Sequence, residues 1–289
     1  MVARRGFEPL SPPHFNDWKR FSLAETEHSM IKTEQVENIL IARLDNPPKN
    51  LMNATMVGQL SELLDRVDAD DAVRVLILTG NMDGVFIQHY DVAELVQTCE
   101  YAREDPGIGK GGELHDTHKC FLKIESIATP VIAAINGTAH GGGYELALAC
   151  DFRLLSEDGS VGLPEAGLGI LPGAGGTQRL ARLIGVARAK YLMMRGQVVD
   201  AKTALDYGMV HQLAAPRNLL DEAMTLAREL AALPQAAVGL IKQSVNEGAQ
   251  LPMPEALRQE EDKFWDLMRT DEAYALMKGY VEAGQNGLE

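Results

Sequence analysis

The sequence is poor in cysteine and in basic residues and has no long apolar run. Each shortage excludes a class of protein. Only Cys99, Cys120 and Cys150 occur in 289 residues, without CxxC spacing, so we expect no disulfide framework and a reducing, cytoplasmic location. No stretch reaches the roughly 18–20 apolar residues that cross a bilayer, so no membrane partner is expected. Lys and Arg total 27 against 41 Asp and Glu, a net charge of −14 that disfavours a nucleic-acid partner.

Apolar residues are plentiful, at 46% of the chain, which is enough to build a folded core. Residues 1–29 stand apart because they contain three prolines and show no helical or strand period. Their basic start is not followed by an apolar segment, so we expect no secretory signal. We interpret residues 1–29 as a loosely ordered extension, 30–217 as an α/β core and 218–289 as a helical region.

The apolar pattern of the core alternates between buried-type strands and amphipathic helices. Strands are predicted at 36–44, 73–79, 130–135 and 152–156. Helices are predicted at 57–67, 92–99, 141–150, 177–184, 188–194, 219–233, 236–246, 253–268 and 272–283. The polar, Gly-rich residues 104–119 predict a long loop. This order of elements predicts an α/β fold with a helical C-terminal third.

A first glycine-rich turn, residues 136–143, separates a predicted buried strand from a predicted helix. Glycine there permits a close approach of the backbone to a ligand, and a helix N-terminus offers unpaired N–H groups to an oxyanion or a phosphate. The alternative is a tight turn without a ligand. Glu145 follows in the first helical turn, where an acid is also favoured by the helix dipole alone.

A second glycine-rich stretch spans residues 164–180 and again leads into a predicted helix. It lacks the Gly-Lys-Ser/Thr of a phosphate-binding loop and the third glycine of the dinucleotide fingerprint. It begins with Pro164 and Glu165, and taken alone Glu165 is a solvated loop acid.

The two stretches GGGYELALACD and PEAGLGILPGAGGTQRL closely resemble the two signature regions of the crotonase superfamily, the enoyl-CoA hydratase/isomerase family. The resemblance extends over residues 35–285. It implies a crotonase-like spiral of strand–strand–helix (ββα) units with a helical C-terminal trimerisation region, and therefore a homotrimer or a dimer of trimers. It also implies an acyl-CoA substrate and no separate cofactor, because coenzyme A is part of the substrate.

The resemblance assigns roles to four positions. The backbone N–H groups of Tyr90 and Gly142 correspond to the oxyanion hole that polarises the thioester carbonyl. Glu145 corresponds to the residue that orients and activates water, and Glu165 to the residue that exchanges a proton with Cα. Both glutamates are present, twenty residues apart, as in hydratases. The expected reaction is the reversible hydration of a 2-enoyl-CoA to a 3-hydroxyacyl-CoA.

Further substrate-binding candidates lie near these motifs or near the C-terminus: Lys49, Asn53, His89, Tyr90, Asp91, His140, Gly141, Gly173 and Lys278. For the histidines the alternative is a wall or surface position, and for the two lysines it is a solvated side chain. His115 and His118 form an HxxH pattern without a supporting ligand, so we expect no metal site.

Several other functions remain open at this stage. Enoyl-CoA isomerase, hydrolase or decarboxylase chemistry would use the same fold, and isomerases of the family can work with the acid at the Glu165 position alone. A non-catalytic acyl-CoA-binding subunit is a further alternative, which the presence of both glutamates disfavours. The unusual segment Gln88-His89-Tyr90 favours a specialised substrate.

Overall fold

The computed structural model describes residues 29–105, 107, 109 and 112–285. The predicted N-terminal extension, residues 1–29, therefore lies outside the described residues apart from Ser29. Within the described part, no helix is long and apolar enough to cross a membrane.

The larger sheet has six strands in the order β1-β2-β3-β5-β7-β10. Its first two strands pair antiparallel and the other neighbours are parallel. The strands are β1 (Ile31–Val36), β2 (Ile39–Leu44), β3 (Val75–Gly80), β5 (Val131–Ile135), β7 (Phe152–Ser156) and β10 (Gln212–Ala214). A second sheet contains β4 (Gly84–Ile87), β6 (Gly137–His140), β8 (Ser160–Gly162) and β9 (Val198–Asp200).

The chain winds through both sheets in a repeated order. The strand pairs β3–β4, β5–β6 and β7–β8 each place one strand in the larger sheet and the next in the smaller sheet, and a helix follows each pair. The pair β3–β4 is followed by α2 (Val92–Glu104) and α3 (Asp116–Ser126), and the pair β5–β6 by α4 (Gly142–Ala149). The pair β7–β8 is followed by the short 3-10 helix η2 (Glu165–Leu168) and by α5 (Gly176–Ile184). This is the expected spiral of strand–strand–helix units, and the predicted fold class is confirmed.

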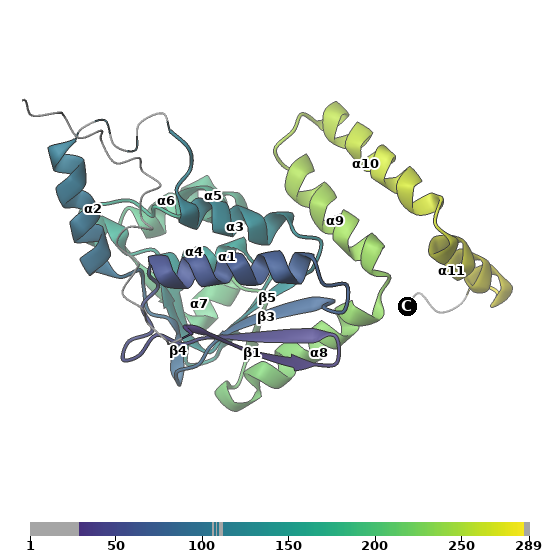
Figure 1. Cartoon of the computed structure of the whole chain (residues 1–289), viewed down its shortest axis with the longest axis horizontal. Coiled ribbons are helices and arrows are strands. Elements are labelled where there is room, and N and C mark those ends of the chain that lie inside the picture. Colours follow the sequence, from purple (N-terminus) through teal and green to yellow (C-terminus); the bar gives the residue numbers. More distant parts are fainter. Residues whose placement is uncertain (1–28, 106, 108, 110–111, 286–289) are drawn as a thin grey trace, which may run out of the picture.

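Both faces of the larger sheet are buried, which explains the unbroken apolar run of β3. Leu76 and Leu78 point toward a core formed with α1 (Ala54–Asp68), α3 and α4. Val75 and Ile77 point to the other face, which α8 (Leu219–Ala232) covers. Figure 1 shows α1 and α8 on opposite sides of the strands.

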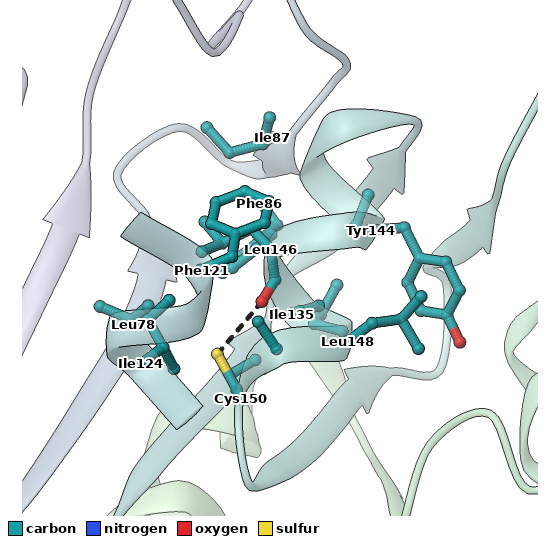
Figure 2. Packing of buried hydrophobic residues seen from close by; sticks show 14 of the residues in the cluster. Leu78, Phe86, Ile87, Phe121, Ile124, Ile135, Tyr144, Leu146, Leu148 and Cys150 are labelled. Carbon is teal, nitrogen blue, oxygen red and sulfur yellow. Dashed lines mark hydrogen bonds between the residues drawn. The ribbon is translucent and has the colours of Figure 1, made fainter. Parts of the chain in front are cut away.

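The first core holds helix α4, which is buried at all eight of its residues. Figure 2 shows Phe86, Phe121 and Leu146 gathered in this core, with Tyr144 and Leu148 beside them. A helix enclosed in this way cannot shift without opening the core, so its first turn is a rigid platform for functional groups.

The remaining helices follow β8. They are α6 (Val186–Met193), α7 (Ala201–Asp206), the 3-10 helix η3 (Pro216–Asn218), α9 (Gln235–Gly248), α10 (Met253–Met268) and α11 (Asp271–Glu282). In Figure 1, α9, α10 and α11 extend to one side of the sheets. Neither α10 nor α11 buries a residue within the single chain.

Three predictions about local structure were wrong. Residues 136–143 were predicted as a glycine-rich turn, but strand β6 occupies residues 137–140 and pairs with β4 and β8. The predicted strand 36–44 is the second half of a hairpin, because Glu37 adopts a positive φ of 57° and turns β1 into β2. The predicted loop 104–119 ends early, since α3 begins at Asp116. The buried residues of α3 are Thr117, Cys120, Phe121 and Ile124, an amphipathic spacing.

Candidate active site

A cavity of about 890 Å³ lies between the first turns of α1, α2, α3 and α4 and the segment that contains η2. Most of the predicted site residues line it: His89, Tyr90, His140, Gly141, Gly142, Glu145, Glu165 and Gly173. Residues 40 or more positions apart thus meet in one place. The cavity also has apolar walls, which Val57, Leu95 and Leu171 help to form.

The segment at Tyr90 runs directly beside the start of α4. The Met52 N–H donates to the His89 carbonyl at 3.0 Å, and the Asp91 N–H donates to the Met52 carbonyl at 2.7 Å. These bonds fix the Tyr90 backbone and leave its own N–H unused. A β-carbon built on Gly142 would lie 3.5 Å from the Tyr90 nitrogen. Neither the Tyr90 N–H nor the Gly142 N–H donates to any other residue that the structure describes.

Glu145 is held rigidly in the first turn of α4, with 3% of its surface exposed. Its Oε1 accepts hydrogen bonds from the Ala174 N–H at 2.8 Å and the Gly176 N–H at 2.7 Å. Burial raises the pKa of the Glu145 carboxyl, and the two hydrogen bonds and the Arg179 charge oppose that rise. The second carboxyl oxygen, Oε2, is therefore available for chemistry while Oε1 anchors the side chain.

Glu165 opens η2 and faces the same cavity. Burial raises the pKa of its carboxyl from 4.5 to about 7, and the charge of Glu145 acts in the same direction. Within the described chain its Oε2 is buried without a hydrogen-bond partner. A carboxyl that is half protonated near neutral pH and carries an unpaired oxygen is suited to accept or to donate a proton.

Two histidines lie beside the turn that starts α4: His140 precedes Gly141, and the His89 Cβ is 3.7 Å from the place that a β-carbon would take on Gly141. The Nδ1 of His89 is 2.7 Å from the Tyr90 carbonyl oxygen. Because a carbonyl only accepts, this Nδ1 carries the hydrogen, and in the neutral ring Nε2 is an acceptor. The Nε2 of His140 is 2.9 Å from the Ser160 hydroxyl, and burial lowers the pKa of His140. Both side chains line the cavity.

The HxxH pair forms contacts within the protein. The Nε2 of His115 lies 3.1 Å from the Gly173 carbonyl oxygen and 2.7 Å from the Nδ1 of His118. Among the residues that the structure describes, no group of three or more His, Cys, Asp or Glu side chains could hold a metal ion.

Four predicted substrate-binding residues lie outside the lining of the cavity. Asn53 and Asp91 cap helices, since their side chains accept hydrogen bonds from the Met56 and Ala93 N–H groups. Lys49 is exposed in the turn before α1. Lys278 is on α11, where its Nζ lies 3.9 Å from Glu282. For these four residues, substrate binding stays a prediction that the geometry of a single chain does not support.

Glu94 is a residue of the site that no sequence motif indicated. Its Oε2 accepts hydrogen bonds from the Tyr90 hydroxyl at 2.9 Å and from the Ala54 N–H at 3.0 Å. Tyr90 and Glu94 are four positions apart across the start of a helix, and side chains at this spacing can touch. This spacing is the sequence signal that could have indicated the contact. This contact fixes the phenol of Tyr90 in the wall of the cavity, and burial raises the pKa of that phenol.

The fold is that of the crotonase-like α/β proteins. The enoyl-CoA hydratase subunit I of Geobacillus kaustophilus superposes with a TM-score of 0.79 at 32% identity, over 89% of this chain and 97% of that one. The enoyl-CoA hydratase of Bacillus anthracis gives a TM-score of 0.80 at 31% identity, over 88% and 97% of the two chains.

The sequence comparisons identify the family. A family model described as enoyl-CoA hydratase/isomerase matches residues 34–288, and the chain belongs to this family. It is 36% identical to the crotonyl-CoA hydratase of Syntrophomonas wolfei, over 86% of this chain and 94% of that protein. It is 34% identical to the short-chain-enoyl-CoA hydratase of Clostridium acetobutylicum, over 82% and 89% of the two proteins. The prediction of an enzyme of this family is confirmed.

Proposed function

We propose that this chain catalyses the reversible hydration of a short-chain 2-enoyl-CoA thioester to a 3-hydroxyacyl-CoA. The observation that carries the proposal is that the carboxyls of Glu145 and Glu165 line one cavity together with Tyr90 and Gly142. The backbone N–H groups of Tyr90 and Gly142 donate to no other residue in the described part of the chain. The names of the crotonyl-CoA and short-chain-enoyl-CoA hydratases support the choice of a short acyl chain.

In the proposed mechanism the thioester carbonyl accepts hydrogen bonds from the N–H groups of Tyr90 and Gly142. Negative charge develops on that oxygen as water adds, and two preorganised donors stabilise it by a few kcal/mol. Both donors are backbone groups on segments that are fixed by other bonds. They therefore need no reorganisation as the charge develops.

The two glutamates divide the proton transfers. The Glu145 carboxylate accepts a proton from water as the water oxygen bonds to Cβ, and the protonated Glu165 gives its proton to Cα. The carbon–carbon double bond is lost, and one water is added. Glu145 then carries a proton and Glu165 carries a charge, so exchange with solvent restores the starting state. No redox or group-transfer partner is needed, and coenzyme A enters as part of the substrate.

The test is incubation of the pure protein with crotonyl-CoA, a longer 2-enoyl-CoA and a 3-enoyl-CoA. Hydration adds the mass of water, isomerisation leaves the mass unchanged, and thioester hydrolysis releases free CoA thiol. A decarboxylase would act on none of the three, because its substrate must carry a carboxylate. We expect water gain from crotonyl-CoA, with the rate lowered by orders of magnitude in Glu145→Gln and Glu165→Gln. Binding without turnover of any of these substrates would instead support a non-catalytic acyl-CoA-binding subunit.

We further propose that α9, α10 and α11 form the contacts of a homotrimer or a dimer of trimers. Support comes from the many exposed apolar side chains on these helices, among them Ile241, Val245, Phe264, Trp265 and Leu276. Such a surface is typical of an interface between subunits. Native mass spectrometry tests the assembly, since a monomer at micromolar concentration would contradict it.

A further inference from the structure

Ala174, whose N–H holds the Glu145 carboxylate, is itself bound through its carbonyl by Arg179. Ala174 donates its N–H to the Glu145 Oε1 at 2.8 Å, and its carbonyl accepts a hydrogen bond from the Arg179 Nη1 at 2.9 Å. One peptide segment thus connects the guanidinium of Arg179 to the carboxylate of Glu145. Any movement of Arg179 would move the donor that fixes Glu145.

Arg179 is fixed in turn by Glu125, at the C-terminal end of α3. The Arg179 Nε and Nη2 donate to the two carboxyl oxygens of Glu125 at 2.6 and 3.0 Å. The side chains of Arg179 and Glu125 are 15% and 29% exposed. A two-pronged pair of this kind sets both the distance and the plane of the guanidinium.

The local backbone leaves room for this arrangement only because Gly175 has no side chain. Gly175 adopts a φ of 101°, and a β-carbon there would lie 2.1 Å from the Arg179 Nη1. The guanidinium therefore fills the space beside the turn that carries Ala174 and Gly176, the two residues that bind Glu145.

Helix α9 fixes the C-terminal end of α3, where Glu125 lies. The Asn246 Nδ2 donates to the Glu125 carbonyl at 2.9 Å. The buried Lys242 donates to the Ile124 carbonyl at 2.8 Å and pairs with Asp151 at 2.8 Å. The end of α3 is thus tied to α9 and to the strand that follows α4, so Glu125 is a fixed point.

We propose that Arg179 and Glu125 are positioning residues for the reaction, which hold the Ala174 carbonyl and so set the Glu145 carboxylate in the cavity. The proposal rests on the function proposed above for Glu145. Neither residue lines the cavity, and both act through the peptide of Ala174.

The charge of Arg179 adds a second effect with a measurable sign. It opposes the rise in the pKa of Glu145 that burial causes. Loss of the positive charge should raise that pKa, whereas loss of the Glu125 charge should not, because Arg179 stays cationic. If Arg179 and Glu125 only stabilised the fold, the loss of either charge would not change the Glu145 pKa in these different ways.

The experiment compares four single variants of the full-length protein: Arg179→Met, Arg179→Lys, Glu125→Gln and Lys123→Met. Lys123 is the matched control because it also pairs from α3, with Asp65 at 2.7 Å, and does not contact the Ala174 turn. Circular dichroism and melting temperature establish folding. Two properties are then measured: kcat and KM on crotonyl-CoA, and the Glu145 carboxyl pKa in the substrate-free protein. The pKa comes from ¹³C NMR of labelled glutamate, with Glu145→Gln to assign the signal.

We expect Arg179→Met to lower kcat by roughly 10- to 100-fold, because displacement of a catalytic group by about 1 Å has this effect. KM should change by less than about threefold, since neither residue touches substrate. The Glu145 pKa should rise, because the positive charge that opposes the effect of burial is removed. Arg179→Lys keeps the charge but loses the two-pronged geometry. Its Glu145 pKa should therefore match the wild type, while its kcat should stay low. Glu125→Gln should lower kcat without raising the pKa, and Lys123→Met should match the wild type.

Two results would overturn the proposal: a folded Arg179→Met variant with wild-type kcat, or an unchanged Glu145 pKa in that variant. The NMR titration needs no turnover, so it separates this proposal from the proposed function. If the wild-type protein does not hydrate crotonyl-CoA, the proposed function is wrong. In that case an unchanged Glu145 pKa in Arg179→Met still overturns the present proposal, because the Arg179 charge would then not act on the carboxyl.

Discussion

Glu165 and Gly141 are in close contact: the Glu165 Oε1 lies 3.1 Å from the place that a β-carbon would take on Gly141. Gly141 also has a φ of 51° and a ψ of −128°, a conformation that L side chains rarely adopt. The carboxyl that we propose as the proton donor is therefore packed against the backbone turn that starts α4.

This contact predicts how a methyl group added at Gly141 would affect stability and activity. Gly141→Ala should lower the melting temperature by several degrees, because it adds backbone strain and crowds Glu165. It should also lower kcat by at least about tenfold, because Glu165 must move. The control is Gly112→Ala in the segment before α3, where a β-carbon meets no described atom within 4 Å. Wild-type kcat in Gly141→Ala would show that the position of Glu165 tolerates this shift.

The raised pKa of Glu165, about 7, predicts the pH dependence of the reaction. Hydration needs a protonated Glu165 and a charged Glu145. Dehydration needs a charged Glu165 and a protonated Glu145. In both directions the active enzyme therefore carries one proton on the two glutamates together. This proton is lost as the pH rises through about 7. We expect kcat/KM to fall above pH 7 by about tenfold per unit in both directions. A flat profile between about pH 6 and 9 would contradict the assignment.

The same titration predicts a change in stability. The pKa of Glu165 in the folded protein lies above its ordinary value of 4.5, so folding favours the protonated form. Stability is therefore lost as the pH rises from about 4.5 through about 7. Glu165→Gln has no charge to bury, and it should melt about 2–5 °C higher than the wild type at pH 8. Below about pH 4, where Glu165 is protonated in the folded and the unfolded chain, the difference should disappear. Glu100→Gln, an exposed site on α2, is the control.

The comparison of sequence and structure shows which signals are local. The start of α4 and the position of Glu145 could be predicted because three glycines lead directly into an apolar helix. The short strand β6 before these glycines was missed, because its four residues show no apolar alternation. The start of α3 at Asp116 was missed because the Gly-rich residues before it carry no capping signal, and His115 makes no side-chain cap. The hairpin turn at Glu37 was missed because glutamate rarely adopts a positive φ.

Other parts of the site depend on contacts between distant segments. The ion pair of Arg179 and Glu125 joins residues 54 positions apart, and no spacing rule connects them. The two N–H donors to Glu145 come from residues 29 and 31 positions further along the chain. The family resemblance predicted the four residues with assigned roles, Tyr90, Gly142, Glu145 and Glu165, which all line the cavity. The bonds that hold them required the fold.

The predicted boundary at Met30 can be tested by truncation. The Met30 N–H donates to the Gln59 Oε1 at 2.8 Å, and the Met30 carbonyl accepts from the Asp45 N–H at 2.8 Å. In a chain that starts at Met30 this nitrogen becomes the terminal ammonium group, which can still donate to Gln59, and the carbonyl is unchanged. We expect its melting temperature to be within about 2 °C of the full chain, with unchanged kcat. A drop of several degrees would show that residues 1–29 pack on the body.

The last prediction separates the backbone of Tyr90 from its side chain. The Tyr90 N–H donates to no residue in the described part of the chain, so Tyr90→Pro breaks no backbone bond of the fold yet removes the proposed oxyanion donor. It should abolish turnover. Tyr90→Ala keeps the donor and removes the phenol that Glu94 holds in the cavity wall.

We therefore expect Tyr90→Ala to change the preference among acyl chains and to keep activity on crotonyl-CoA within about tenfold, because pocket fit contributes roughly 1–3 kcal/mol. The measurement is kcat/KM for crotonyl-CoA and for a longer 2-enoyl-CoA, with CoA binding and melting temperature to confirm that both variants are folded. If Tyr90→Ala is as inactive as Tyr90→Pro on every substrate, the phenol itself takes part in the chemistry. The hydration mechanism proposed here, in which only the Tyr90 backbone acts, would then be wrong.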